Sequence, residues 1–283
     1  MAARQGGVVS RAQLIEAGLR AGGILRRVRA GRLHPVHPGV YAVGHRALGQ
    51  TGREWAAVLA AGPGAALSHR SAGARLGIRP WSGRVELTVP RRHRPIDGVR
   101  LHRTRSLHPD DITLDEDGLP CTSWARTIVD LAELLSVHDL TRVLERSAVQ
   151  RCYDGRALAA AMTRANGRRG LRTLLAALAL GHHRMPQSTR SDLEELFLRV
   201  ARGMGLRPRL NRWMQVSGVW MEADAWFPAE RVVIELDSRW HDTAGARERD
   251  AVRDAALAAA GIGFARLRRH DLTEAHLRAV LSR

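Results

Sequence analysis

The sequence predicts an α+β protein of several domains, and three observations lead to this fold class. The chain has 283 residues, which suits two or three cores of ordinary size rather than one. Two short helical patterns and two short strand patterns fill the first 48 residues, and helix and strand patterns alternate through the last hundred. We therefore expect domains at residues 1–48, 49–185 and 186–283, with mixed α/β structure in the middle.

The charge of the chain favours a polyanionic partner. Its formal net charge is +17, and every one of its 45 lysine-or-arginine positions is arginine. A guanidinium stays charged at any cellular pH and donates two hydrogen bonds to one phosphate. Nucleic acid is therefore favoured over a membrane surface, although GC-rich codons also explain part of the arginine bias.

Cysteine usage and hydropathy indicate an intracellular protein. Cys121 and Cys152 lack the spacing of a zinc cluster or of a disulfide framework. The first residues contain no apolar signal core, and no uncharged run approaches membrane-spanning length. We expect a cytoplasmic protein without a membrane partner.

The first domain begins with two predicted helices. Ser10 is a suitable N-cap for a helix over residues 11–17, which Gly18 ends. A second helix is expected over residues 21–30. Its apolar stripe consists of Ile24, Leu25 and Val28.

Two strands are expected next, at residues 31–33 and 39–43, around a turn at Pro35 and Pro38. Helix, tight turn, basic helix and hairpin is the plan of a winged helix, whose second helix enters the major groove of double-stranded DNA. The candidate DNA contacts here are Arg20, Arg26, Arg27, Arg29 and Arg32. The alternative is that these arginines only solvate a small helical bundle.

The middle region shows a mixed pattern. Helices are expected at residues 51–61 and 68–76, strands at 85–89 and 99–102, and three or four helices between 122 and 180. The acidic run from Asp110 to Asp117 is predicted to be a solvated loop. Ser68-His69 and Arg126/Asp130 could be polar contacts of a functional site. A helix cap is the simpler explanation for the first pair, and an i,i+4 ion pair for the second. Residues 181–188 are the predicted linker.

The last domain is predicted to have the element order α-β-β-β-α-β-α. A helix capped by Ser191 is followed by strands at residues 209–216, 219–227 and 231–237. A helix over 243–260, a strand over 263–267 and a closing helix capped by Asp271 complete it.

Strand alternation gathers carboxylates on one hairpin. Asp224 and Glu235 become cross-strand neighbours if residues 227–230 form the turn. Glu194 lies beside the apolar stripe of the preceding helix, whereas Glu195 points to solvent. Acids gathered in a basic chain repel one another, and a divalent cation relieves that repulsion. The alternative is that these acids form the solvent-exposed face of a hairpin at the edge of the sheet.

These residues resemble the PD-(D/E)XK nuclease superfamily, in particular its very-short-patch-repair-like branch, the DUF559 family. The motifs that carry the resemblance are Ser191-Asp-Leu-Glu194, Asp224-Ala-Trp-Phe-Pro228, Glu235-Leu-Asp237, His241, residues 250–253 and residues 261–267. The resemblance implies a restriction-endonuclease-like αβββαβ domain. In it Asp224 and Glu235 ligate Mg²⁺ or Mn²⁺, Glu194 supports the metal, Asp237 stands where many relatives carry lysine, and His241 assists proton transfer or holds a phosphate.

Such a site hydrolyses a DNA phosphodiester through a metal-bound water. The arginines expected to hold the flanking DNA backbone are Arg247, Arg249, Arg253, Arg266, Arg268 and Arg269. Two departures stand against cleavage: Ser238 replaces the glycine common in the family, and no lysine is present. A nuclease fold that has lost cleavage and only holds DNA is the competing interpretation.

A second resemblance covers about residues 5–135. Gly6-Gly-Val-Val-Ser10, Gly39-Val-Tyr-Ala-Val43, Leu67-Ser-His-Arg-Ser-Ala72 and residues 122–132 are similar to the AbiEi-type antitoxins of type IV toxin–antitoxin systems. The resemblance implies operator binding and autorepression, with a nucleotidyltransferase toxin as partner. A non-enzymatic regulator is therefore the alternative to an endonuclease.

Overall fold

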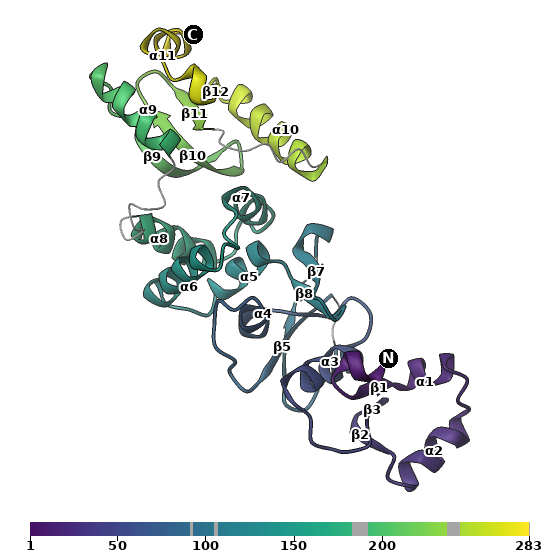
Figure 1. Cartoon of the computed structure of the whole chain (residues 1–283). Helices are drawn as coiled ribbons and strands as arrows, with labels where there is room; N and C mark the ends of the chain where they lie inside the picture. Colours follow the sequence, from purple (N-terminus) through teal and green to yellow (C-terminus); the bar gives the residue numbers. More distant parts are fainter. Residues whose placement is uncertain (91–92, 105–106, 183–191, 237–243, 283) are drawn as a thin grey trace. The chain divides into compact units, whose positions relative to one another are not determined.

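The computed structural model describes residues 1–90, 93–104, 107–182, 192–236 and 244–282 (Figure 1). The chain divides into two compact units. The first contains Met1–Leu134 and Arg146–Cys152, and the second contains Leu135–Glu145 and Tyr153–Arg283. Within the described ranges, no helix combines the length and the apolar character needed to cross a membrane.

Among the described residues before Leu134, the first unit contains two sheets, five α-helices and two 3-10 helices (η). Its elements in chain order are η1 (Ala2–Gln5), β1 (Val8–Ser10), α1 (Arg11–Glu16), α2 (Ala21–Arg29), β2 (Leu33–His37), β3 (Val40–Val43), α3 (Gln50–Ala61), β4 (Ala66–Leu67), α4 (His69–Arg75), β5 (Val85–Val89), β6 (Val99–Arg103), η2 (Pro109–Asp111), β7 (Ile112–Leu114), β8 (Pro120–Thr122) and α5 (Trp124–Leu131).

Residues 1–44 form two helices and a three-stranded sheet of order β1-β3-β2. Ser10 caps α1 as predicted, in a reciprocal capping box with Gln13. The first hairpin strand was predicted too early: it starts at Leu33 and includes Pro35, which an edge strand tolerates because its outer N–H groups have no ladder partner. Strand β1 was not predicted.

The predicted apolar stripe on α2 is wrong at one position, Leu25. Ile24 is buried against Val9 and Leu33, but Leu25 is 50 % exposed. A nine-residue helix that rests on a small sheet covers only a narrow strip, and Leu25 falls outside it.

One hydrophobic core joins the N-terminal sheet to the rest of the first unit. Val8 and Ala42 pack in the same buried cluster as Trp55 of α3 and Leu87 of β5. Gly6 and Gly52 approach so closely that a Cβ on Gly52 would lie 2.5 Å from the carbonyl oxygen of Gly6. The N-terminal sheet and the segment that follows it therefore belong to one compact unit.

The second sheet of this unit has the order β6-β5-β4-β8-β7, with β5 and β6 parallel. The acidic run from Asp110 to Asp117, which includes β7 of this sheet, is not wholly a solvated loop. Asp111 is 3 % exposed and accepts from Arg126 at 3.0 Å, and Arg126 also makes the predicted ion pair with Asp130. The guanidinium fork joins both carboxylates, which makes the burial of all three charges tolerable.

The second unit contains the remaining elements. They are α6 (Val137–Val149, whose last residues belong to the first unit), α7 (Gly155–Arg164), α8 (Gly170–His182), α9 (Asp192–Gly203), β9 (Arg209–Val216), β10 (Val219–Phe227), β11 (Val232–Leu236), α10 (Ala244–Ala259), β12 (Gly263–Leu267), η4 (Arg269–Asp271) and α11 (Glu274–Leu281). From α9 onward, the predicted order of helices and strands is confirmed.

A four-stranded sheet of order β12-β11-β10-β9 organises this part of the chain. Phe197 of α9 packs with Phe227 and Ile234 in one core, and Leu257 of α10 packs with Val233 in another. The closing helix is capped differently from the prediction: Thr273 accepts from His276 N at 3.2 Å, while Asp271 accepts from the backbone of Arg268 at 2.9 Å.

Helix α7 lies against the β9–β10 hairpin. Thr163 accepts from the backbone N–H of Trp220 at 2.8 Å, and Asn166 donates to the carbonyl oxygen of Gly218 at 2.8 Å. These bonds bring α7 over the strand that carries the predicted carboxylates.

Candidate functional site

The outward side of α2 carries a group of predicted DNA contacts. Arg20, Arg26, Arg27 and Arg29 are all exposed. Arg27 donates to the carbonyl oxygen of Gly23 at 3.2 Å, which keeps its side chain along the helix surface. Because Ile24 is buried on the opposite side, α2 presents its cationic face to solvent.

The β2–β3 hairpin extends this cationic surface. Arg32, directly before β2, is exposed. The hairpin turns at Gly39, whose φ of +75° is a left-handed conformation that glycine adopts without strain. One ring nitrogen of His34 lies 3.2 Å from the carbonyl oxygen of Gly44 and ties the end of the hairpin to β2.

In the second unit, Asp224 and Glu235 lie close together on neighbouring strands. The antiparallel pairing of β10 with β11 ends at Ala225 and Ile234, these two acids follow directly after that pair, and the charge of Asp224 raises the pKa of Glu235. The carboxylate of Asp224 accepts from the backbone N–H of Leu236 at 2.8 Å. The structure thus brings these two acids together as the alternation of the sequence indicates.

Helix α9 places its two glutamates differently. Glu194 is half-buried and Glu195 is exposed, as the helical phase predicts. Glu194 lies near enough to Glu222 of β10 to raise the pKa of that carboxyl, although burial is the largest cause. Glu194 therefore belongs to the acidic surroundings of the β10–β11 hairpin.

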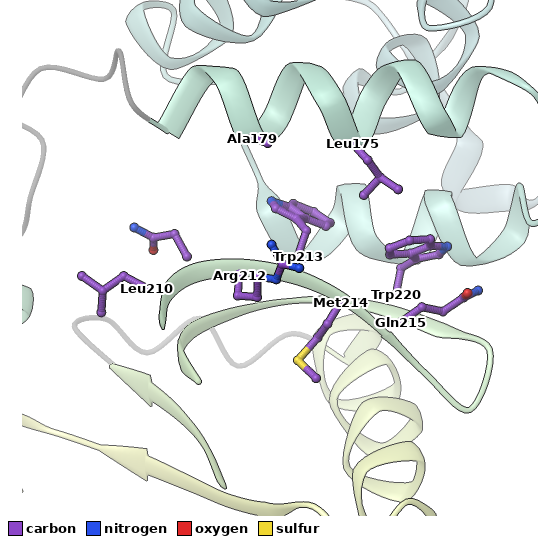
Figure 2. A pocket seen from close by; sticks show the side chains of 9 residues that line it. Leu175, Ala179, Leu210, Arg212, Trp213, Met214, Gln215 and Trp220 are labelled. Carbon is purple, nitrogen blue, oxygen red and sulfur yellow. The ribbon is translucent and has the colours of Figure 1, made fainter. Parts of the chain in front are cut away.

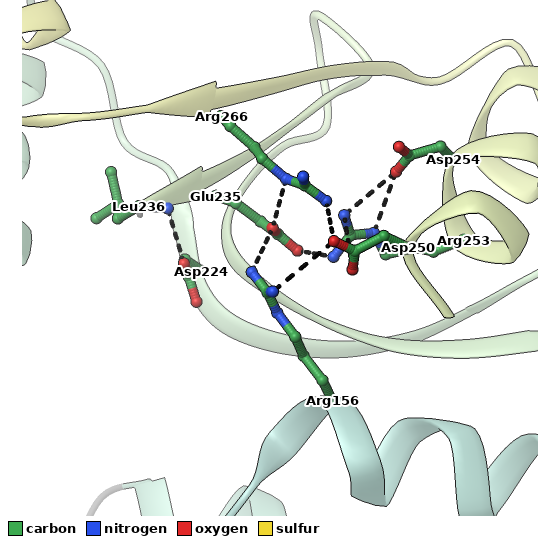
Figure 3. Close-up of polar contacts among 8 residues, drawn as sticks. All are labelled: Arg156, Asp224, Glu235, Leu236, Asp250, Arg253, Asp254 and Arg266. Carbon is green, nitrogen blue, oxygen red and sulfur yellow. Dashed lines mark hydrogen bonds and ion pairs between the residues drawn. The ribbon is translucent and has the colours of Figure 1, made fainter. Parts of the chain in front are cut away.

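Three arginines surround the carboxylate of Glu235 (Figure 3). Arg253 of α10 donates to one of its oxygens, and Arg156 of α7 donates to the other at 3.1 Å. Arg266 of β12 lies 3.4 Å from the same oxygen as Arg156 and pairs with Asp250 at 2.6 Å. Both oxygens of Glu235 are thus held by guanidinium groups.

This arrangement is buried at its centre and exposed at its edge. Glu235 is 5 % exposed and Arg253 is 7 % exposed, whereas the side chain of Arg156 is 51 % exposed. Burial raises the pKa of Glu235, and Arg253 and Arg156 offset part of that rise. Arg253, a predicted DNA contact, is placed on Glu235 instead of on the surface.

In this conformation Glu235 offers Mg²⁺ no carboxylate oxygen that is not already bound to arginine. Mg²⁺ needs carboxylate oxygens that are free to coordinate, yet both oxygens of Glu235 are engaged by arginine, and one oxygen of Asp224 accepts from the backbone. Among the described residues, the side chains that converge closely enough to hold a metal ion lie elsewhere, at His69, Glu86 and His102.

The sequence did not single out Glu222 as a functional residue. Tyr153, just before α7, donates to its carboxylate at 3.4 Å. Burial, followed by the charge of Asp224, raises the pKa of Glu222 to about 7. The signal in the sequence was its place two residues before Asp224, on the same face of the strand.

The remaining predicted residues divide into two groups. Asp237 and His241 lie outside the described residues, and so does the side chain of Arg247. Arg268 and Arg269, which follow β12, are exposed, and Arg249 is half-buried. Their proposed contacts with DNA stay predictions.

A pocket of about 590 Å³ lies between α8 and the β9–β10 hairpin (Figure 2). Trp213 and Trp220 line it together with Arg212 and Leu175. Two indoles and a guanidinium form a surface suited to flat, electron-rich rings. No spacing motif pointed to this pocket, because its walls come from three separate elements.

The comparison with protein families concerns the N-terminal segment. Residues 1–44 match the family model described as transcriptional regulator, AbiEi antitoxin. The match covers α1, α2 and the β2–β3 hairpin, and therefore all five of the exposed arginines described above. No curated protein matches the chain.

Proposed function

We propose that the protein is a DNA-binding transcriptional regulator of the antitoxin type. In this proposal residues 1–44 form a winged helix in which α2 enters the major groove and the hairpin lies on phosphates. The observation that carries it is the exposed arginine face of α2 beside the hairpin, within the segment that resembles antitoxin regulators. Arginines on that face supply both phosphate contacts and base contacts.

The proposal includes autorepression and a toxin partner. A regulator of this type binds its own operator, and its counterpart is a nucleotidyltransferase toxin encoded nearby. Both parts rest on the resemblance of residues 1–44 and of the motifs in the first unit.

The second unit supports a subsidiary proposal, a restriction-endonuclease-like domain that no longer cleaves DNA. The element order and the closeness of Asp224 to Glu235 favour this fold. The three arginines on Glu235 oppose metal binding, because they supply the positive charge that a metal ion provides in an active nuclease. The domain then adds cationic surface for DNA.

Fluorescence anisotropy with duplexes tests the main proposal. The protein should bind a duplex from the promoter of its own gene about 1,000-fold more tightly than a scrambled duplex. It should also repress a reporter placed behind that promoter. Equal binding to the two duplexes, without repression, would contradict a regulatory role.

A plasmid assay separates the regulator from the nuclease. The protein is incubated with supercoiled plasmid and Mg²⁺ or Mn²⁺, beside Glu235→Ala and Asp224→Ala. We expect no metal-dependent nicking. Nicking that is lost in both variants would establish the endonuclease instead.

A further inference from the structure

The first unit contains a cluster of metal-binding side chains outside both regions described above. His69 begins α4, Glu86 lies on β5 and His102 lies on β6. Each offers one donor atom, and these atoms all lie within 4.8 Å of one another. His69 and Glu86 are each 3 % exposed, whereas the side chain of His102 is 20 % exposed and opens the cluster to solvent.

The sheet and the start of α4 bring these residues together. In the parallel pairing of β5 and β6, Glu86 lies beside Arg100 and Thr88 beside His102, so Glu86 and His102 are diagonal neighbours on one face. The backbone of Ser68 donates to the carbonyl oxygen of Glu86 at 3.0 Å, which places His69 at the same edge.

The backbone at His69 is unusual. Its φ is +50°, a left-handed conformation that few non-glycine residues adopt. This conformation lays the His69 ring against His102, with ring centroids 3.5 Å apart. Ser68 was predicted to cap α4, but its hydroxyl makes no cap bond and instead lies 2.9 Å from Nδ1 of His69.

The surroundings of the three side chains fix which atoms face one another. Nδ1 of His69 lies 2.9 Å from the hydroxyl of Ser68, which fixes the orientation of the ring. One oxygen of Glu86 is held by Arg70 at 3.1 Å, and the other lies 2.8 Å from Nε2 of His102. Burial opposes ionisation of Glu86, but its bonds to His102 and Arg70 lower its pKa to about 2, so a carboxylate is present.

We propose that His69, Glu86 and His102 bind a divalent transition-metal ion of the Zn²⁺ type. Two imidazoles and one carboxylate suit Zn²⁺, whereas Mg²⁺ prefers oxygen ligands only. Donors around tetrahedral Zn²⁺ lie about 3.4 Å apart, so side-chain rotations have to close the cluster by up to about 1.4 Å, and the ion has to take the place of the bond between His102 Nε2 and Glu86. Three protein ligands leave one coordination position for water on the side of His102.

Isothermal titration of the full chain, freed of metal with a chelator, tests this site with Zn²⁺ as the probe. We expect saturation at one ion per chain. In the same experiment His102→Gln should weaken binding at least 100-fold, because even changes around a metal ligand cost 10–100-fold. The matched control is His138→Gln, which removes an exposed histidine of α6 and should leave Zn²⁺ binding unchanged.

Co²⁺ absorption supplies a second measurement. Visible bands of tetrahedral Co²⁺ should appear with the wild type and be absent from His69→Gln and Glu86→Gln, provided that circular dichroism shows both variants folded. If either variant unfolds, the absorption of His102→Gln, a change at a partly exposed position, decides whether Co²⁺ binds at this site. No saturable uptake by the wild type, or uptake that His102→Gln leaves unchanged, would overturn the site and assign the binding to scattered surface histidines.

Discussion

Glu235 and Arg253 form a buried ion pair at the position where the sequence pattern places a metal ligand. Arg253 comes from α10, and its guanidinium also lies 4.8 Å from the centre of the Phe264 ring. Removing one partner of an ion pair that is shielded from water is costly, because the other partner is left charged and buried. Replacing both partners by apolar residues costs much less. This property gives a direct test of the arrangement.

Replacing Arg253 alone should destabilise the second unit. We expect Arg253→Leu to lower the free energy of unfolding by about 3 kcal/mol, because Glu235 loses its most buried partner. The double variant Glu235→Leu/Arg253→Leu should recover most of that loss. Urea unfolding followed by tryptophan fluorescence measures both, and a double variant as unstable as the single one would show that the pair is not isolated from water.

The raised pKa of Glu222 predicts a pH dependence of stability. The folded state keeps a proton on Glu222 up to about pH 7, whereas the unfolded chain loses it near the ordinary value of 4.5. Unfolding then becomes easier as the pH rises through this window. Relative to Glu222→Gln, the wild type should lose on the order of 1 kcal/mol between pH 5 and pH 8. Parallel pH profiles of the two proteins would disprove the shift.

The arginines of α2 should determine the salt dependence of DNA binding. Each phosphate contact contributes about 0.9 to the slope of log K against log salt. The variant Arg26→Gln/Arg27→Gln/Arg29→Gln should therefore reduce that slope by up to about 3 and weaken binding at least tenfold at 100 mM salt.

A charge-matched variant controls for the general basicity of the chain. Arg199, Arg202 and Arg278 are exposed on α9 and α11, and their replacement by glutamine removes the same charge. We expect a much smaller change of slope. Equal effects of the two triple variants would mean that net charge, and not the face of α2, attracts DNA.

The contact between Gly6 and Gly52 predicts an unusual cost for alanine in a helix. Gly52→Ala should destabilise the first unit by about 2 kcal/mol, because the new methyl group meets the carbonyl oxygen of Gly6. Gly22→Ala is the control, since a Cβ there meets nothing within 4 Å and alanine is the better helix former. Thermal unfolding of both variants decides, and an unchanged midpoint for Gly52→Ala would refute the close contact.

The sequence allowed prediction of those features that depend on local periodicity. Strands at residues 209–216, 219–227 and 263–267 were predicted to the residue, because apolar alternation and adjacent turns mark their ends. The closeness of Asp224 to Glu235 was expected from the same alternation, and the charge of Asp224 does act on Glu235. Strand β4, of two residues, has no periodicity to detect.

The features that were missed depend on contacts between distant segments. Arg156, Arg253 and Arg266 meet at Glu235 from three elements, and no spacing in the sequence relates them. His69 and His102 are likewise 33 residues apart and meet because β4, which precedes His69, and β6, which carries His102, both pair with β5. Local patterns indicate which face a residue occupies, but not which partner it has across the fold.

The shared core beneath the N-terminal sheet has a consequence during synthesis on the ribosome. Val8 and Val40 are covered by a cluster that also includes Leu119 and Cys121, so a nascent chain of 44 residues lacks the side chains that shield them. We expect this segment to fold completely only after the rest of the cluster has emerged, since contacts distant in sequence form late. An excised 44-residue fragment would share that incomplete state and expose valines to aggregation.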